Sequence, residues 1–137
     1  MYNKVLEISP DTTSVHLGIS SVYVLQGNFD EALRAIEKEK LEGYRYCGEA
    51  IAFYALGRQS ESDQRLAALI AVGNHWSFQI ATVYAFREQV NEAFEWLERA
   101  YNSHDAGIPI TKVHPFMKPL HADPRWMIFI NKVGLAE

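Results

Sequence analysis

The sequence contains a single cysteine, Cys47, among its 137 residues, and this scarcity excludes several classes of protein. One cysteine forms neither a disulfide framework nor a multi-cysteine zinc site. Eight glycines and five prolines are too few for a collagen-like or low-complexity chain. Hydrophobic residues make up 48% of the chain and charged residues only 22%. This composition excludes intrinsic disorder and provides enough apolar material for one domain with a core held by packing.

The chain also lacks an excess of basic residues and a long uninterrupted apolar run. Its net charge is −4 and its isoelectric point about 5.7, so we expect no nucleic-acid partner. Two stretches without charged side chains, 12–29 and 66–86, are broken by polar residues and turn signals, which predicts no membrane span. No cationic segment precedes a long apolar run at the start, as a secretory signal would require. Together with the single cysteine, this favours a cytoplasmic protein.

What the sequence does contain is a pattern of small and aromatic residues that recurs three times. Each aromatic residue is preceded by a small residue at three positions and followed by another at nine. The three sets are Ser20, Tyr23 and Ala32; Ala50, Phe53 and Ser62; and Ala81, Tyr84 and Ala93. Small residues at fixed positions let two antiparallel helices approach closely while a ring fills the gap beside them. The spacing predicts three helix pairs.

A turn is expected inside each repeat, between the aromatic residue and the second small residue. The first two repeats carry Gln26-Gly27-Asn28 and Leu56-Gly57-Arg58 there, and glycine adopts the left-handed conformation that ends many helices. The third repeat has Arg87-Glu88-Gln89 and no glycine. The sequence therefore predicts a sharp turn in two repeats and leaves the third open.

At these residues the chain resembles the tetratricopeptide repeat family, whose pattern is W-x2-L-G-x2-Y, then A-x3-F, then P. The matching segments are His16-x2-Ile19-Ser20-x2-Tyr23 with Ala32-x3-Ile36, and Ser77-x2-Ile80-Ala81-x2-Tyr84 with Ala93-x3-Leu97. The second repeat departs most, with Glu49 at the leucine position. The resemblance implies an all-α fold, a right-handed superhelical stack of antiparallel helix pairs (an α-solenoid) with a C-terminal capping helix.

The last 32 residues break the repeat. Gly107-Ile108-Pro109 predicts a loop, residues 115–120 a short helical turn, and Asp123-Pro124 the start of a final helix that Gly134 ends. The stretch from Lys112 to Trp126 resembles the closing segment of tetratricopeptide arrays in bacterial multidomain signalling proteins. These include adenylate and guanylate cyclases, serine/threonine kinases and winged-helix regulators. That family usually has an aspartate at the position of His114, so a role of the aspartate cannot be assigned to this chain.

We therefore expect a single domain over 1–137. It comprises the end of a preceding repeat (1–11), three repeats (12–42, 43–73 and 74–105) and a capping tail (106–137). Pro10 stands where the proline that closes a repeat would lie, so we expect the C-terminal module of a longer protein. The apolar residues before Pro10 would then form an end surface on which earlier repeats stack or a homodimer forms. They are Tyr2, Val5, Leu6 and Ile8.

In this family the first helix of each repeat lines the concave surface that binds peptides. Carried over position by position, the resemblance implies a groove formed by Leu17, Ser21, Val24 and Leu25; Cys47, Ile51, Tyr54 and Ala55; and Phe78, Thr82, Ala85 and Phe86. The Lys, Asn and Arg set that clamps a peptide carboxylate in chaperone-binding members is absent from these positions. An apolar helix or extended segment is the expected guest. The alternative is that the C-terminal tail folds into the groove and uses these residues as core.

Residues capable of chemistry form no recognisable catalytic pattern. The five histidines include no pair at helical ligand spacing, which argues against a zinc site. Cys47 has no base nearby in the sequence and is interpreted as a small buried hydrophobe. Glu92, Glu95 and Glu98 follow one side of a predicted helix and are interpreted as a solvated face. We expect no enzyme activity, no metal and no cofactor.

The function these observations favour is a protein interaction scaffold, the tetratricopeptide module of a larger bacterial signalling protein such as a nucleotide cyclase. Its partner would be a protein, a peptide or another domain of the same chain. Two alternatives stay open: a small-ligand or metal-binding enzyme that uses the tail around His114 and His121, and a purely structural dimerisation end.

Overall fold

The computed structural model describes residues 15–134, which form helices joined by short turns. That range contains no β-strand, and no helix in it combines the length and the apolar character that a membrane span needs. The chain divides after residue 72 into two compact units. The expected boundary between the second and third repeats, after residue 73, lies one residue away, while the single-domain assignment stays a prediction. The proposed stacking end, Tyr2, Val5, Leu6 and Ile8 with Pro10, lies outside the described residues.

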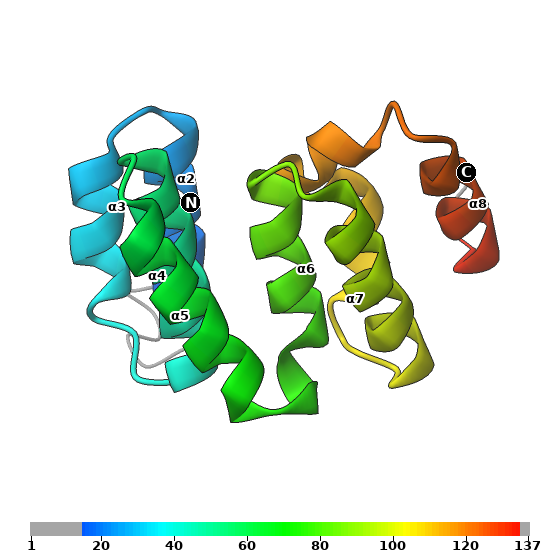
Figure 1. The fold of residues 1–137 in the computed structure, drawn as a ribbon, viewed down its shortest axis with the longest axis horizontal. Helices are drawn as coiled ribbons and strands as arrows, with labels where there is room; N and C mark the ends of the chain where they lie inside the picture. Colours follow the sequence, from blue (N-terminus) through cyan, green and yellow to red (C-terminus); the bar gives the residue numbers. More distant parts are fainter. Residues whose placement is uncertain (1–14, 135–137) are drawn as a thin grey trace. The chain divides into compact units, whose positions relative to one another are not determined.

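The first unit contains two helix pairs. Helices α2 (Val15–Leu25) and α3 (Phe29–Ile36) form one pair, and α4 (Glu42–Ala55) and α5 (Gln59–Val72) form the other. The helices of each pair run antiparallel (Figure 1). Helix α4 also packs against both α2 and α3, so the second pair stacks on the first through its leading helix.

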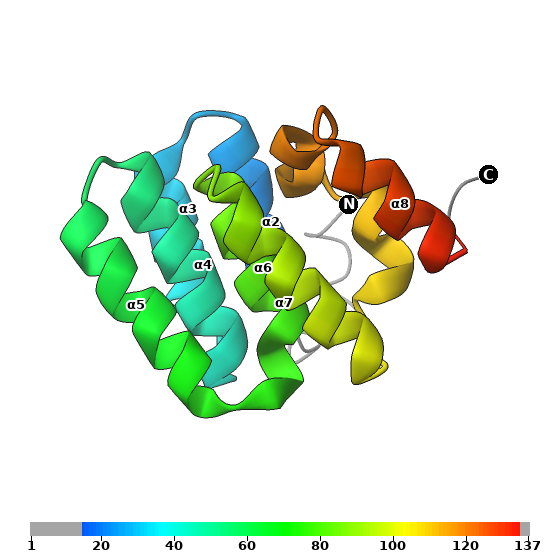
Figure 2. The same ribbon diagram turned by 45° about the vertical axis from the view of Figure 1, so that its right-hand side comes forward.

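The second unit contains the third helix pair and the tail. A 3-10 turn, η1 (Asn74–Trp76), leads into α6 (Ser77–Phe86), which pairs with α7 (Val90–Asn102), as Figure 2 shows from a second direction. The tail forms two 3-10 helices, η2 (Ile108–Val113) and η3 (Pro115–Leu120), and then α8 (Pro124–Lys132). The predicted turn over 115–120 and the final helix are confirmed, whereas the loop expected from Gly107 is largely the helical segment η2.

The small residues of the repeats lie where the two helices of each pair meet. All six are buried: Ser20, Ala32, Ala50, Ser62, Ala81 and Ala93. In the first pair the Ser20 hydroxyl donates a hydrogen bond across to the Ala32 carbonyl oxygen at 2.8 Å. In the second pair the direction reverses, and the Ser62 hydroxyl donates to the Ala50 carbonyl at 2.7 Å. The close approach of the two helices, and with it the prediction of three helix pairs, is confirmed.

The turns within the three pairs have the same geometry although one lacks glycine. Gly27 and Gly57 have φ angles of +80° and +79°, and Glu88 takes the equivalent position with φ +61°. The residue after each donates its amide to the carbonyl of the repeat's aromatic residue, at 2.8–2.9 Å. A left-handed non-glycine residue costs about 1–2 kcal/mol, and packing of α6 against α7 offsets this cost in the third pair. The sequence had left this turn open, and the structure shows that it is sharp.

Stacking inside the first unit depends on the absence of a side chain at Gly48. A Cβ atom placed there would overlap the Cγ1 and Cδ1 atoms of Ile36, which is fully buried at the end of α3. Glycine in a helix interior costs about 1 kcal/mol relative to alanine. Gly48 therefore allows the α4 backbone to approach α3 closely, at the expense of helix propensity.

A double-mutant cycle on these two residues tests the contact. Gly48→Ala should lower the free energy of unfolding by about 1–3 kcal/mol, since the added methyl group has no space. In an Ile36→Ala background the same substitution should be neutral or stabilising by up to about 1 kcal/mol, because helix propensity is then the main term. Urea unfolding followed by circular dichroism measures both values. Equal costs in the two backgrounds would contradict the close approach of α3 and α4.

Candidate interaction surface

On α2, the expected groove residues range from buried to open. Val24 is buried, Leu17 and Ser21 are half-buried, and Leu25 is 57% exposed. The Ser21 hydroxyl donates to the Leu17 carbonyl at 2.8 Å, so that polar group is satisfied within its own helix. The exposed apolar surface of α2 also includes Val22, which the family positions did not identify. Helix α2 thus presents at least one large apolar side chain to solvent.

On α4, the expected groove residues are more deeply placed. Cys47 and Ile51 are almost completely buried, and Tyr54 and Ala55 are half-buried. The interpretation of Cys47 as a buried hydrophobe is confirmed. The accessible part of this set is therefore the end of α4 at Tyr54 and Ala55.

On α6, the expected groove residues lie against the chain's own tail. Phe78, Thr82 and Ala85 are buried, and Phe86 is half-buried. The Phe86 ring meets the Phe116 ring edge to face, with centroids 5.0 Å apart. Of the two possibilities left open by the sequence, an open or a filled groove, the structure has the filled one at α6. The peptide-binding role of the twelve positions itself stays a prediction.

The start of the tail is fixed to the N-terminal end of α6 by an aspartate that sequence reasoning missed. The Asp105 carboxylate accepts hydrogen bonds from the backbone amides of Phe78, at 3.2 Å, and Gly107, at 2.8 Å. A Cβ atom on Gly107 would overlap the Phe78 ring, so the backbone lies directly on that side chain. The hydrogen bond between Asp105 and Phe78 joins residues 27 positions apart, so no local sequence pattern predicts it.

His114 holds the middle of the tail in place. Its Nδ1 atom accepts a hydrogen bond from the Phe116 amide at 3.2 Å and so caps η3. Its ring lies 5.8 Å from the Phe78 ring and 5.5 Å from the Phe116 ring, centroid to centroid. Burial lowers the pKa of His114 to about 4, so the imidazole is neutral at pH 7. The tail helix α8 starts in the same way, since Asp123 precedes a proline and accepts the Arg125 amide at 2.9 Å.

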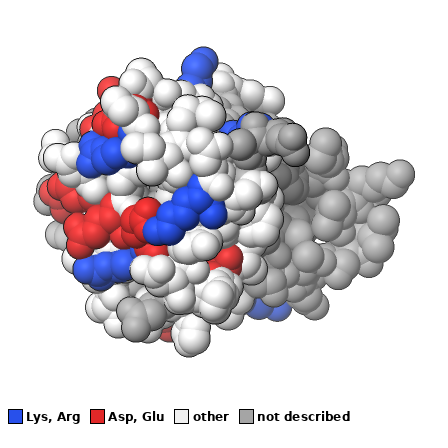
Figure 3. Space-filling model, turned by 90° about the vertical axis from the view of Figure 1, so that its right-hand side faces the viewer, with Lys and Arg blue, Asp and Glu red and all other residues white. Residues whose placement is uncertain are grey.

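The basic residues of α8 contact α7. Arg125 donates to the Asn91 side chain at 2.9 Å and lies over the Phe94 ring, while Lys132 pairs with Glu98 and lies over the Tyr101 ring. Figure 3 shows acidic and basic side chains adjoining one another on the side where α8 lies in Figure 1. Arg125 also holds the pKa of Asp123 down to about 2 through its side-chain and backbone hydrogen bonds. Arg125 and Lys132 therefore both contact acidic, polar and aromatic side chains of the second unit.

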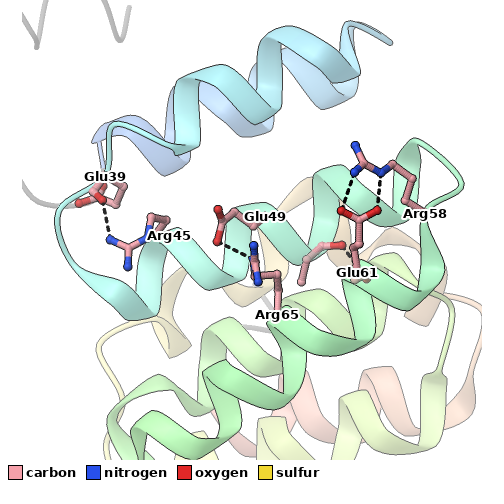
Figure 4. Close-up of polar contacts among 8 residues, drawn as sticks. Glu39, Arg45, Glu49, Arg58, Glu61 and Arg65 are labelled. Atoms are coloured by element: carbon pink, nitrogen blue, oxygen red, sulfur yellow. Dashed lines mark hydrogen bonds and ion pairs between the residues drawn. The ribbon is translucent and has the colours of Figure 1, made fainter.

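Glu49 occupies the leucine position of the second repeat and is compensated by an arginine. Its Oε1 atom lies 3.1 Å from Arg65 Nε on α5, and the two side chains point toward each other in Figure 4. Burial raises the pKa of Glu49, and the nearby Arg65 opposes that shift. The ion pair joins the two helices of the second pair, and it explains how a carboxylate is accommodated at a core position.

The described residues contain no cluster of three or more His, Cys, Asp or Glu side chains that could hold a metal ion. His114 serves as a cap, and His121 stacks on Trp126 with ring centroids 4.5 Å apart. In α7, Glu95 pairs with Arg99 and Glu98 with Lys132. These two histidines and two glutamates therefore each make a contact that stabilises the second unit.

Comparison of the chain with protein-family models, with curated proteins and with solved structures gives no match.

Phe78 distinguishes a core position from a groove position. Because its side chain is 2% exposed and lies under Gly107 and His114, Phe78→Ala should lower the free energy of unfolding of the second unit by about 3–5 kcal/mol. All three tryptophans of the chain lie in residues 73–137, so tryptophan fluorescence during urea unfolding reports on this unit. The control is Ile128→Ala on α8, a residue 68% exposed, which should change stability by less than about 0.5 kcal/mol. Equal costs for the two variants would mean that Phe78 is not core.

Proposed function

We propose that this chain is a tetratricopeptide-like interaction module that binds an apolar peptide segment of a partner protein. The observation that carries the proposal is the stacking in the first unit, where α4 packs against both helices of the preceding pair. Helix pairs that stack through their leading helices form the extended surfaces that repeat proteins use for binding. The repeated small-residue contacts and turns support the same family.

The first unit is the proposed binding region. In the second unit the tail already covers Phe78 and Phe86, so the corresponding surface of α6 is occupied. In the first unit Leu25 is exposed, and Leu17, Tyr54 and Ala55 are half-buried. These four residues are the proposed anchors for the guest.

The chemistry of α2 favours an apolar guest. Residues 15–25 contain no Asp, Glu, Lys or Arg, so this helix offers no charged side chain to hold a peptide carboxylate. Leu25 and Val22 give it exposed apolar surface instead. An amphipathic helix or an extended segment with one or two large apolar side chains fits such a surface best.

The finer assignments follow from the sequence resemblance. They comprise a right-handed superhelical stack, a place at the C-terminal end of a cytoplasmic bacterial signalling protein, and a role in positioning a partner or another domain of that protein. The resemblance of the tail from Lys112 to Trp126 supports them.

A peptide selection tests the proposal. A display library of random 12-residue peptides is selected on the whole chain, and the affinity of synthetic copies is measured by fluorescence polarisation. Leu25→Asp should weaken binding by about 10-fold to 100-fold, because burial of a leucine side chain contributes about 1.5–3 kcal/mol. Leu25 is exposed, so circular dichroism of this variant should match the parent chain.

The matched control is Ile128→Asp, which places the same charge on an exposed apolar residue of the second unit. It should leave peptide affinity unchanged. A library that yields no binder, or binders that are lost in Ile128→Asp and kept in Leu25→Asp, would contradict the proposed surface.

A further inference from the structure

Residues 107–120, named here the strap, cover one face of α6 and contain a titratable group at the centre of the contact. The strap includes η2 and η3 and touches α6 at three points: Gly107 on the Phe78 ring, His114 on the same ring, and Phe116 on Phe86. Met117 and Leu120 of the strap are fully buried in the core of the second unit. Of the groups at the three contact points with α6, only His114 changes charge between pH 4 and pH 7.

The contacts of His114 require its neutral form. A hydrogen-bond acceptor at Nδ1 is a nitrogen with a free lone pair, and protonation converts it to a donor that faces the Phe116 amide. The cap of η3 is then lost. Burial of the half-exposed ring beside Phe78 and Phe116 also disfavours the charged imidazolium.

Charged groups on the neighbouring elements do not compensate a cation at His114. Helix α6 has no Asp, Glu, Lys or Arg, and its one titratable side chain is Tyr84. The strap itself carries only the cations Lys112 and Lys118, and both are exposed. Asp105, which precedes the strap, is engaged by the Phe78 and Gly107 amides.

The charged groups of α7 and α8 have partners of their own. The contacts are Glu92 with Gln89, Glu95 with Arg99, Glu98 with Lys132, and Arg125 with Asn91 and Asp123. The shift of the His114 pKa to about 4 has burial as its cause, and no carboxylate among residues 15–134 contributes to it.

We propose that the strap is a proton-released cover: protonation of His114 detaches residues 107–120 from α6 and exposes Phe78 and Phe86, while the α6–α7 pair stays folded. The docked strap binds fewer protons than the detached one, so docking is strongest above the ordinary histidine pKa and weakens as the pH falls toward 4. Only the strap detaches from α6, and its release requires no binding partner.

The expected size of the effect follows from the two pKa values of the histidine. With a pKa of about 6.5 when detached and about 4 when docked, the ratio of detached to docked strap should rise roughly 30-fold between pH 7.5 and pH 5.0. Most of the change falls below pH 6.5.

Hydrogen exchange of the whole chain measures this ratio by region. Exchange is followed by mass spectrometry at pH 7.5 and 5.0, with labelling times scaled for the pH dependence of chemical exchange. Peptides from residues 108–120 should show the 30-fold increase in opening, while peptides from α6 and α7 should change less than about 2-fold. His114→Asn keeps an acceptor for the Phe116 amide and removes the titration, so its strap should be insensitive to pH over this range.

The matched control is His121→Asn, which removes the exposed histidine that stacks on Trp126 and should retain the pH response. Three results would overturn the proposal. One is a strap whose opening is equal at the two pH values, and another is a response that persists in His114→Asn. The third is loss of protection in α6 and α7 together with the strap, which would mean that the unit unfolds as a whole.

Discussion

The helix pairs of this protein form where two helices approach closely at small residues. Hydrogen bonds join Ser20 with Ala32 and Ser62 with Ala50, and the third pair has Ala81 and Ala93 at the equivalent positions, both in the core where α6 packs on α7. All six residues are buried. In two of the pairs a serine hydroxyl at the contact donates to a backbone carbonyl of the opposite helix, and so satisfies a polar group that burial would otherwise penalise. Because the backbones are close, the aromatic residue of each repeat and the turn that follows it fall in the same positions every time.

The leading helices α4 and α6 pack against different neighbours in the two units. In the first unit α4 packs against both helices of the preceding pair, which requires Gly48 beside Ile36. In the second unit the strap covers α6, tied by Asp105 at one end and packed through Phe116 and Met117 at the other. The proposed binding function uses the part of the first unit where Leu25 stays exposed.

The features that the sequence predicted correctly are those with a local signal. The spacing of small and aromatic residues predicted three helix pairs, and Asp123-Pro124 predicted the start of α8. The turn at Glu88 was left open because its left-handed residue is stabilised by packing and carries no glycine signal. The contacts of Asp105 and His114 with Phe78 link distant parts of the chain, so no spacing rule could place them. The sequence left open whether Phe78 lines an open groove or packs against the tail, and only the structure distinguishes the two.

Enlarging one small residue in each pair tests whether the small-residue contacts hold the helix pairs together. The variants are Ala32→Leu, Ser62→Leu and Ala93→Leu, and the reference is Ala67→Leu on the exposed face of α5. We predict that each of the three lowers the free energy of unfolding, measured by urea titration, by about 3 kcal/mol or prevents folding, because the opposing backbone leaves no room. The reference should stay within about 0.5 kcal/mol of the parent. If any of the three were tolerated as well as Ala67→Leu, the helices of that pair would not meet at the small residues.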